Sequence, residues 1–130
     1  TEAFNAILDA FRIKTSNNQE EKLKENEIQK ATLNAINIPL AIMETSFQSM
    51  DIIENLVNIG NPNSVSDVGV AVLCARSAVI GGYLNVMINI KDYNNEKEKK
   101  AIIRKANKLK NKAIEKEAKI LKNVVQIITK

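Results

Sequence analysis

Apolar side chains recur at the period of an α-helix along most of the chain. Over residues 1–14, Phe4, Ile7 and Phe11 belong to an apolar stripe, and mostly polar residues fill the positions between them. This spacing predicts an amphipathic helix. No capping residue or loop precedes it, so we expect that the element begins before residue 1. Residues 15–18 are polar and predict a turn.

A second helical pattern extends over residues 19–59, where the apolar positions keep the helical period. Pro39 interrupts it. Proline lacks the backbone N–H and disfavours helical geometry at the preceding residue, so we expect a kink or a break. One long helix fits best, and two shorter helices are the alternative. Gly60 supplies a natural C-cap, and Pro62 prevents the helix from continuing.

Two further helices complete the pattern. Residues 67–90 form an apolar run with many small side chains, which we interpret as a helix buried inside the protein. Residues 94–130 are highly charged, with apolar positions near heptad spacing, and predict a helix about 55 Å long. We expect such a helix to pack along the 19–59 helix or against a second subunit. The predicted fold is therefore all-α, an antiparallel bundle of long helices.

The composition supports this fold class and excludes several chemistries. A chain of 130 residues is enough for one domain, so residues 1–130 are expected to form a single helical domain. Four Gly and two Pro leave little turn chemistry for many short strands. Without His and with one Cys, these residues cannot form the common zinc sites, a disulfide framework, or a Ser-His-Asp or Cys-His pair. We expect no metal. Cys74, alone in an apolar run, favours a reduced, cytoplasmic environment.

The net charge of +4 is unevenly distributed, with −4 on residues 1–90 and +8 on residues 91–130. A basic segment attracts polyanions such as nucleic acid, anionic lipid or polycarboxylate metabolites. A solvated lysine-rich helix face is the simpler interpretation. The segment lacks interleaved aromatic residues, so we expect no nucleic-acid binding. Residues 68–90 have the length of a membrane span, but Arg76, two asparagines and three glycines are costly in hydrocarbon, and we expect no membrane insertion.

The loop over residues 61–67 is the most distinctive polar segment. Ser64, Ser66 or Asp67 can accept hydrogen bonds from the free N–H groups at the start of the next helix. The same helix start, flanked by hydroxyls and amides, can instead hold an anionic or polar ligand group. Arg76 needs either an acidic neighbour or a ligand carboxylate. One helix stripe of mostly small or polar residues predicts either a shallow groove or a close helix–helix seam; it contains Asp67, Ala71, Cys74, Ala78, Gly82, Asn85 and Asn89.

The run NPNSVSDVGVAVLCARSAVIGGYLNVMINI resembles the formimidoyltetrahydrofolate cyclodeaminase and methenyltetrahydrofolate cyclohydrolase family. Members share an Asn-Pro-Asn-Ser-x-Ser-Asp-x-Gly loop, a small-residue helix and a Gly-x-Tyr-x-Asn-Val stretch, which match residues 61–69 and 81–86 here. The Ala-Phe pairs near the start are also similar. Family members begin with an additional helical segment bearing Gly-Gly-Gly-Ser. These residues lack it, so the resemblance implies that part of the domain and of the folate site lies outside them.

The resemblance further implies an all-helical homodimer that needs no metal and acts on a tetrahydrofolate derivative. In cyclodeaminases, the nitrogen at folate position 10 attacks the formimidoyl carbon, and the tetrahedral intermediate expels ammonia to give 5,10-methenyltetrahydrofolate. Cyclohydrolases instead interconvert methenyl- and 10-formyltetrahydrofolate through water. Both reactions need proton transfer at nitrogen, which positioned carboxylates and hydroxyls supply.

Under this resemblance, Asp67 is the candidate catalytic group, transferring a proton or stabilising the cationic carbon from a helix start where its charge is favourable. The basic segment would steer the glutamate tail of folate. Other loop and helix residues would orient the pterin or its substituent; these substrate-binding candidates are Asn61, Asn63, Ser64, Ser66, Arg76, Gly82 and Asn85.

Two classes of function remain open. The first is a folate one-carbon enzyme, either a cyclodeaminase that releases ammonia or, as the alternative, a methenyltetrahydrofolate cyclohydrolase. The two would use the same loop, so the sequence does not separate them. The second class is a non-catalytic helical dimerisation or interaction module, whose small-residue stripe binds a partner helix.

Overall fold

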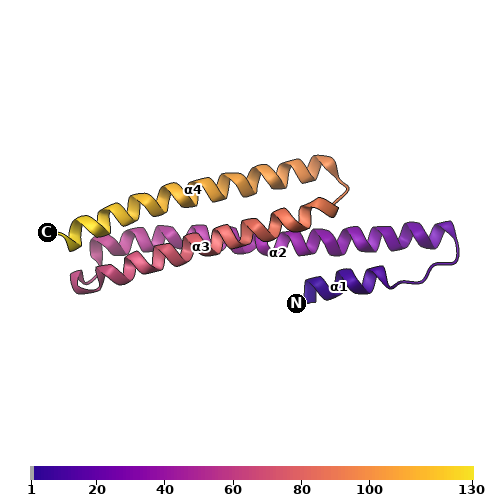
Figure 1. Cartoon of the computed structure of the whole chain (residues 1–130), viewed down its shortest axis with the longest axis horizontal. Helices are drawn as coiled ribbons and strands as arrows, with labels where there is room; N and C mark the ends of the chain where they lie inside the picture. Colours follow the sequence, from indigo (N-terminus) through magenta and orange to yellow (C-terminus); the bar gives the residue numbers. More distant parts are fainter. Residues whose placement is uncertain (1) are drawn as a thin grey trace.

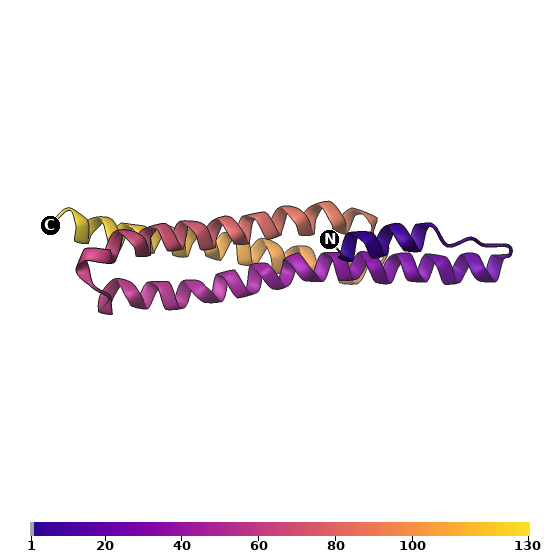
Figure 2. The same ribbon diagram turned by 90° about the horizontal axis from the view of Figure 1, so that it is seen from below.

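The protein, described here over residues 2–130 in a computed structural model, is a bundle of long antiparallel helices (Figures 1 and 2). The predicted all-α fold is confirmed, and no strand occurs among residues 2–130. Helices α2, α3 and α4 run side by side, while the short α1 folds back along the first half of α2. The elements are α1 (Glu2–Phe11), α2 (Asn18–Ile59), the 3-10 turn η1 (Pro62–Ser64), α3 (Val65–Asn89), the 3-10 turn η2 (Ile90–Asp92) and α4 (Glu96–Ile128).

Helix α2 continues without a break through Pro39, so the alternative of two shorter helices is wrong. Proline at this position cannot donate to the carbonyl of Ala35, four residues earlier. Asn89 of α3 replaces the missing donor: its Nδ2 donates to the Ala35 oxygen at 2.9 Å. A side chain from the neighbouring helix thus satisfies the carbonyl that the proline leaves free, which helps one long helix to tolerate Pro39.

The turn between α2 and α3 is capped differently from the prediction. Gly60 is the expected C-cap, and its N–H donates to the Leu56 carbonyl. The Asn61 side chain caps the 3-10 turn by accepting from the Asn63 N–H at 3.0 Å. Ser64 occupies the N-cap of α3 but makes no side-chain capping bond. Because α3 begins at Val65, two residues earlier than predicted, Ser66 and Asp67 lie inside its first turn and do not cap it.

The core is built on a seven-residue repeat in each long helix, which is the spacing of a coiled-coil seam. Helix α4 packs against both α3 and α2, as expected for a helix of its length. Nine apolar side chains of the described residues have no exposed surface, three on each helix: Ile36, Met43 and Met50; Val72, Val79 and Val86; Ala106, Ala113 and Ile120.

Gly82 lets α3 approach α2 closely. A Cβ at this position would lie 2.6 Å from the Met43 side chain and 2.9 Å from the Pro39 carbonyl oxygen. Neighbouring Gly81 is different, since a Cβ there would meet nothing within 4 Å. The first glycine is therefore required by the α2–α3 contact, and the second faces open space.

Helix α3 is less buried than the sequence suggested. The span Pro62–Asp92 is long and apolar enough to cross a membrane by length and composition; an 18-residue window within it has a mean hydropathy of 1.6, and 22% of that window is buried. Its inner side enters the core, whereas Val70, Leu84 and Ile88 on the outer side are 58%, 61% and 58% exposed. The interpretation of residues 67–90 as a helix buried inside the protein therefore holds for the inner side, because α2 and α4 cover only that side among the described residues.

The basic α4 is partly neutralised by acidic residues of α2. Lys116 pairs with Asp51 and, at 3.0 Å, with Glu54; Lys119 lies 2.7 Å from Glu54, and Lys105 pairs with Glu44. Hydrogen bonds from Lys119 and Lys116 hold the pKa of Glu54 below its ordinary value. These ion pairs support the simpler interpretation of the positive segment as a solvated helix face. In the structure, this face lies along the acidic residues of α2.

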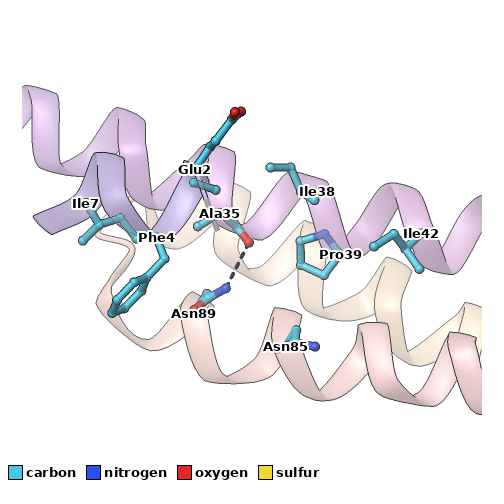
Figure 3. A pocket seen from close by; sticks show the side chains of 10 residues that line it. Glu2, Phe4, Ile7, Ala35, Ile38, Pro39, Ile42, Asn85 and Asn89 are labelled. Carbon is cyan, nitrogen blue, oxygen red and sulfur yellow. Dashed lines mark hydrogen bonds between the residues drawn. The ribbon is translucent and has the colours of Figure 1, made fainter. Parts of the chain in front are cut away.

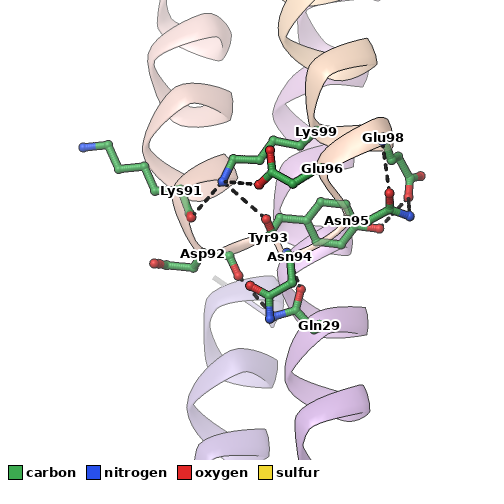
Figure 4. A network of polar contacts seen from close by, with 9 residues as sticks. All are labelled: Gln29, Lys91, Asp92, Tyr93, Asn94, Asn95, Glu96, Glu98 and Lys99. Carbon is green, nitrogen blue, oxygen red and sulfur yellow. Dashed lines mark hydrogen bonds and ion pairs between the residues drawn. The ribbon is translucent and has the colours of Figure 1, made fainter.

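A polar network fixes the other end of the bundle, where α3 turns into α4 (Figure 4). Gln29 of α2 bridges the turn: it donates to the Asp92 carbonyl at 3.1 Å and accepts from the Asn94 N–H at 2.9 Å. The Tyr93 hydroxyl donates to Glu98, which raises the pKa of the phenol. These bonds hold the η2 turn against α2.

Candidate functional site

The structure places the predicted site residues in three separate locations rather than one. The loop Asn61–Asp67 lies at one end of α3, Gly82 and Asn85 lie toward the other end, and Arg76 faces α4. Asp67 and Asn85 are separated by about 27 Å along the helix at 1.5 Å per residue. A single copy of these residues does not bring Asp67 and Asn85 to the same ligand.

The loop end is open to solvent. Asn61, Asn63, Ser64, Ser66 and Asp67 are all exposed. Asp67 occupies the first turn of α3, where its negative charge faces the positive end of the helix dipole. The arrangement offers hydroxyls, amides and one carboxylate at a helix start, and none of these residues lines the cavities described below.

A cavity of about 700 Å³ lies instead where α1, α2 and α3 meet (Figure 3). Its walls are mainly apolar, with the Asn85 and Asn89 amides on the α3 side. Asn85 donates to the Gly81 carbonyl at 3.0 Å, within its own helix. A mainly apolar cavity with few polar groups is typical of a small-molecule site. The lining residues are Glu2, Ala3, Phe4, Ile7, Ala35, Ile38, Pro39, Ile42, Asn85 and Asn89.

A second, more polar cavity of about 350 Å³ shares Ile7 and Asn89 with the first. Lys91 and Asn94 lie on its α3 side, and Glu25 and Thr32 come from α2. Asp92 also lines the second cavity, so its charged groups are one ammonium and two carboxylates. The pair of cavities therefore offers an apolar space for a ring system next to a polar region in which Lys91 is the cationic group. Of the predicted candidates, only Asn85 lines either cavity.

Sequence reasoning assigned no site role to Phe4 or Ile38; it included Asn89 only as a member of the small-residue stripe and Lys91 only as part of the basic segment. The signal that could have identified Asn89 was present in Pro39, because an interior proline leaves a carbonyl that needs an external donor. Phe4 and Ile38 were recognisable only as apolar helix positions, and their contribution to a cavity depends on how α1 folds back.

Gly82 and Arg76 have structural roles in this chain. Gly82 is buried against α2 and does not line either cavity. The Arg76 Nε lies 3.7 Å from a carboxylate oxygen of Glu117 on α4, and that nitrogen is buried with no hydrogen-bond partner among residues 2–130. Of the two alternatives for Arg76, the structure shows the ion pair.

Metal-binding side chains do not converge in the described part of the chain, where no group of three His, Cys, Asp or Glu residues could hold a metal ion. The candidate site therefore consists of a carboxylate-bearing loop at one end of α3 and two adjoining cavities toward the other end.

Comparison with known proteins decides the family. Residues 1–108 match the family model for formiminotransferase-cyclodeaminase. The chain belongs to this family. A methenyltetrahydrofolate cyclohydrolase of Methylorubrum extorquens is 34% identical over 90 residues, which cover 69% of this chain and 43% of that relative. A formimidoyltransferase-cyclodeaminase of Mus musculus is 31% identical over 94 residues, covering 72% of this chain and 17% of that relative.

A third relative, the formimidoyltransferase-cyclodeaminase of Gallus gallus, is 29% identical over 97 residues, covering 75% of this chain and 18% of that relative. The chain thus spans less than half the length of these relatives. The family match ends at residue 108, so it includes the loop, α3 and both cavities but leaves the last part of α4 outside. The resemblance found in the sequence motifs is confirmed at the level of the family.

Proposed function

We propose that this chain is part of a folate one-carbon enzyme that forms 5,10-methenyltetrahydrofolate from 5-formimidoyltetrahydrofolate with release of ammonia. The observation that carries the proposal is the family match over residues 1–108, which includes the carboxylate-bearing loop and the paired cavities. A lyase of this kind needs a bound tetrahydrofolate derivative as substrate and no metal.

A methenyltetrahydrofolate cyclohydrolase is the second candidate function. The relative with this name has 34% identity, against 31% for the mouse cyclodeaminase, and this difference favours it slightly. Both reactions pass through a tetrahedral carbon between two folate nitrogens, so the same groups would serve either. The cyclodeaminase expels ammonia from this carbon, whereas the cyclohydrolase adds water to it or expels water from it.

In this proposal, the residues at one end of α3 bind the substrate, and those at the other end take part in proton transfer. The apolar cavity beside Phe4 and Ile38 would hold the pterin ring, with Asn85 available to orient it. Lys91 would attract the carboxylates of the glutamate tail. Because Asp67 of the same copy lies at the opposite end of α3 from this cavity, Asp67 of the second copy in the proposed homodimer would move the proton at nitrogen or stabilise the cationic carbon. Asn61, Asn63, Ser64 and Ser66 of that copy would position the substituent beside it.

The proposal also covers the cellular compartment, the oligomeric state and the binding partners of the protein. We place the protein in the cytoplasm as a homodimer that binds neither nucleic acid nor membrane. A cytoplasmic setting suits the single exposed thiol of Cys74. A non-catalytic dimerisation module is the competing class, and turnover of a folate substrate separates the two.

The test is the near-ultraviolet absorbance of methenyltetrahydrofolate after either 5-formimidoyl- or 10-formyltetrahydrofolate is added to the whole protein that contains this chain. Product from the formimidoyl compound supports the cyclodeaminase, and product from the formyl compound alone supports the cyclohydrolase. Asp67→Asn should lower the rate about 100-fold or more.

Asp51→Asn is the matched control, because Asp51 lies on the α4-facing side of α2 and pairs with Lys116. It should keep the wild-type rate. Equal rates for Asp67→Asn and Asp51→Asn would contradict the catalytic role of Asp67. No product from either substrate would contradict the folate assignment.

A further inference from the structure

Thr32 of α2 carries a hydroxyl that no neighbouring residue uses. The residue is only 4% exposed, yet its side chain forms no hydrogen bond within residues 2–130. The hydroxyls of Ser49 and Thr129, by contrast, donate to backbone carbonyls three and four residues earlier, at 2.7 and 2.8 Å. Thr32 therefore does not bond back to its own helix in this way.

The Thr32 hydroxyl faces the second cavity. Thr32 lines this cavity. Among the buried and half-buried residues of 2–130, only the Arg76 Nε is a side-chain polar atom that is fully buried without a partner, so the Thr32 hydroxyl keeps contact with the space of the cavity. A buried polar group beside a cavity needs a partner that enters the cavity, either a ligand group or a water molecule.

Asn89 of α3 presents a free acceptor to the same space. Its Nδ2 donates to the Ala35 carbonyl at 2.9 Å (Figure 3), while its Oδ1 accepts no hydrogen bond from residues 2–130. Asn89 lines both cavities. The boundary between the cavities therefore offers one hydroxyl that can donate and one amide oxygen that can accept.

The positions of these two side chains are fixed by bonds on both sides of Thr32. Gln29, three residues before Thr32, donates to the Asp92 carbonyl at 3.1 Å. Ala35, three residues after Thr32, accepts from Asn89. Helix α2 is thus joined to the end of α3 one turn before and one turn after Thr32. Groups held in this way lose little conformational freedom when a ligand binds.

Other polar side chains of the second cavity are already bonded within the protein. Glu25 accepts from Gln29 at 3.2 Å and from Asn94 at 3.1 Å. Gln29 uses both ends of its amide, because it also accepts from the Asn94 N–H. Thr32 and Asn89 are uncharged and still have free capacity. A ligand group that suits both is neutral and has one acceptor and one N–H donor, as a secondary amide does.

We infer that Thr32 and Asn89 bind the amide that joins the benzoyl ring to glutamate in the folate substrate. The Thr32 hydroxyl donates to the amide oxygen, and the Asn89 Oδ1 accepts from the amide N–H. The inference rests on the proposed function and deepens it by assigning the link between the ring system in the apolar cavity and the carboxylates near Lys91.

Calorimetric titration of the whole protein that contains this chain tests the inference. The two probes are 5-formyltetrahydrofolate and 5-formyltetrahydropteroate, which ends in a benzoate and lacks the amide. Thr32→Val replaces the hydroxyl with a methyl group of similar size and should weaken binding of the first probe about fivefold. It should leave the affinity for the second probe unchanged. Thr32→Ser keeps the hydroxyl and should retain most of the affinity for the first probe.

Thr45→Val is the matched control, because Thr45 also lies on α2 but is exposed and lines neither cavity. It should keep both affinities. Thr32→Val should stay folded, since it removes a buried polar group that has no partner in the protein. Circular dichroism should therefore show a melting temperature no lower than that of the wild type.

Three results would overturn the inference. The first is an unchanged affinity of Thr32→Val for 5-formyltetrahydrofolate, as expected if water or a further segment of the protein bonds to the hydroxyl. The second is an equal loss for both probes, which would indicate a structural role. The third is a wild type that does not bind 5-formyltetrahydrofolate.

The same experiment separates this inference from the proposed activity. Turnover of a folate substrate together with an unchanged affinity of Thr32→Val would refute the inference and keep the activity. A loss of affinity that depends on the amide, without turnover of either substrate, would refute the activity and keep the inference.

Discussion

The inner and outer sides of α3 contain similar residue types but differ in what covers them. Inside, Val72, Val79 and Val86 have no exposed surface, and outside, Val70 and Ile88 expose more than half of theirs. Both sides follow a seven-residue repeat. The difference shows that periodicity identifies a surface suited to packing, but it does not tell whether the partner lies in the same chain.

The largest expected effect is the difference between two adjacent glycines, Gly82 on the inner side of α3 and Gly81 on the outer side. Gly82→Val should lower the free energy of unfolding by about 3 kcal/mol, because the new side chain overlaps Met43 and the Pro39 carbonyl. Gly81→Val should keep a cooperative transition, since its side chain enters open space. Chemical denaturation followed by circular dichroism measures both. Equal losses in the two variants would refute the distinction between the sides.

A smaller effect is expected for the asparagine at the edge of the inner side. Asn89→Ala should cost about 1–2 kcal/mol, because it removes the donor to the Ala35 carbonyl that Pro39 leaves free. Asn85→Ala is the matched control and should cost little, since Asn85 bonds only to the carbonyl of Gly81 on its own helix.

Pro39→Ala sharpens this test by restoring the backbone donor to Ala35. In that background Asn89→Ala should cost clearly less, and a double-mutant cycle of unfolding free energies measures the coupling. The same cost with and without the proline would show that the Asn89 bond does not compensate for Pro39.

The smallest effect concerns the ion pairs on the α4-facing side of the bundle. Lys119 and Lys116 lower the pKa of Glu54 in the folded state, so its contribution to stability is present above its ordinary pKa of 4.5 and is lost as the pH falls through the lower folded value. Glu54→Gln should therefore destabilise the protein at neutral pH and lose that effect in acid.

Thermal unfolding as a function of pH measures the Glu54 contribution. Glu115→Gln serves as its control, because Glu115 is exposed and forms no ion pair among residues 2–130. A destabilisation by Glu54→Gln that persists unchanged into acid would contradict the role of the two lysines.

Most of the fold could be predicted from the sequence, because local patterns determine it. Helical periodicity placed all four helices, and Gly60 with Pro62 marked the end of α2. The fate of Pro39 could not be predicted from local rules, since it depends on Asn89, which is distant in the sequence. The predicted capping by Ser66 or Asp67 is wrong because the helix begins earlier, after the 3-10 turn; Ser64 occupies the N-cap but makes no side-chain capping bond.

The site was less predictable than the fold. The family motif drew attention to residues 61–69 and 81–86, but the two segments lie at opposite ends of one helix. The cavities depend on the return of α1 over α2 and α3, which no local pattern specifies. Arg76 had two possible partners in the sequence, and only the packing of α4 brought Glu117 beside it.

The most direct test of the proposed homodimer is the concentration dependence of the melting temperature. A folded dimer is stabilised by mass action, so the wild-type melting temperature should rise with protein concentration. A wild-type melting temperature that does not change with protein concentration would contradict the homodimer.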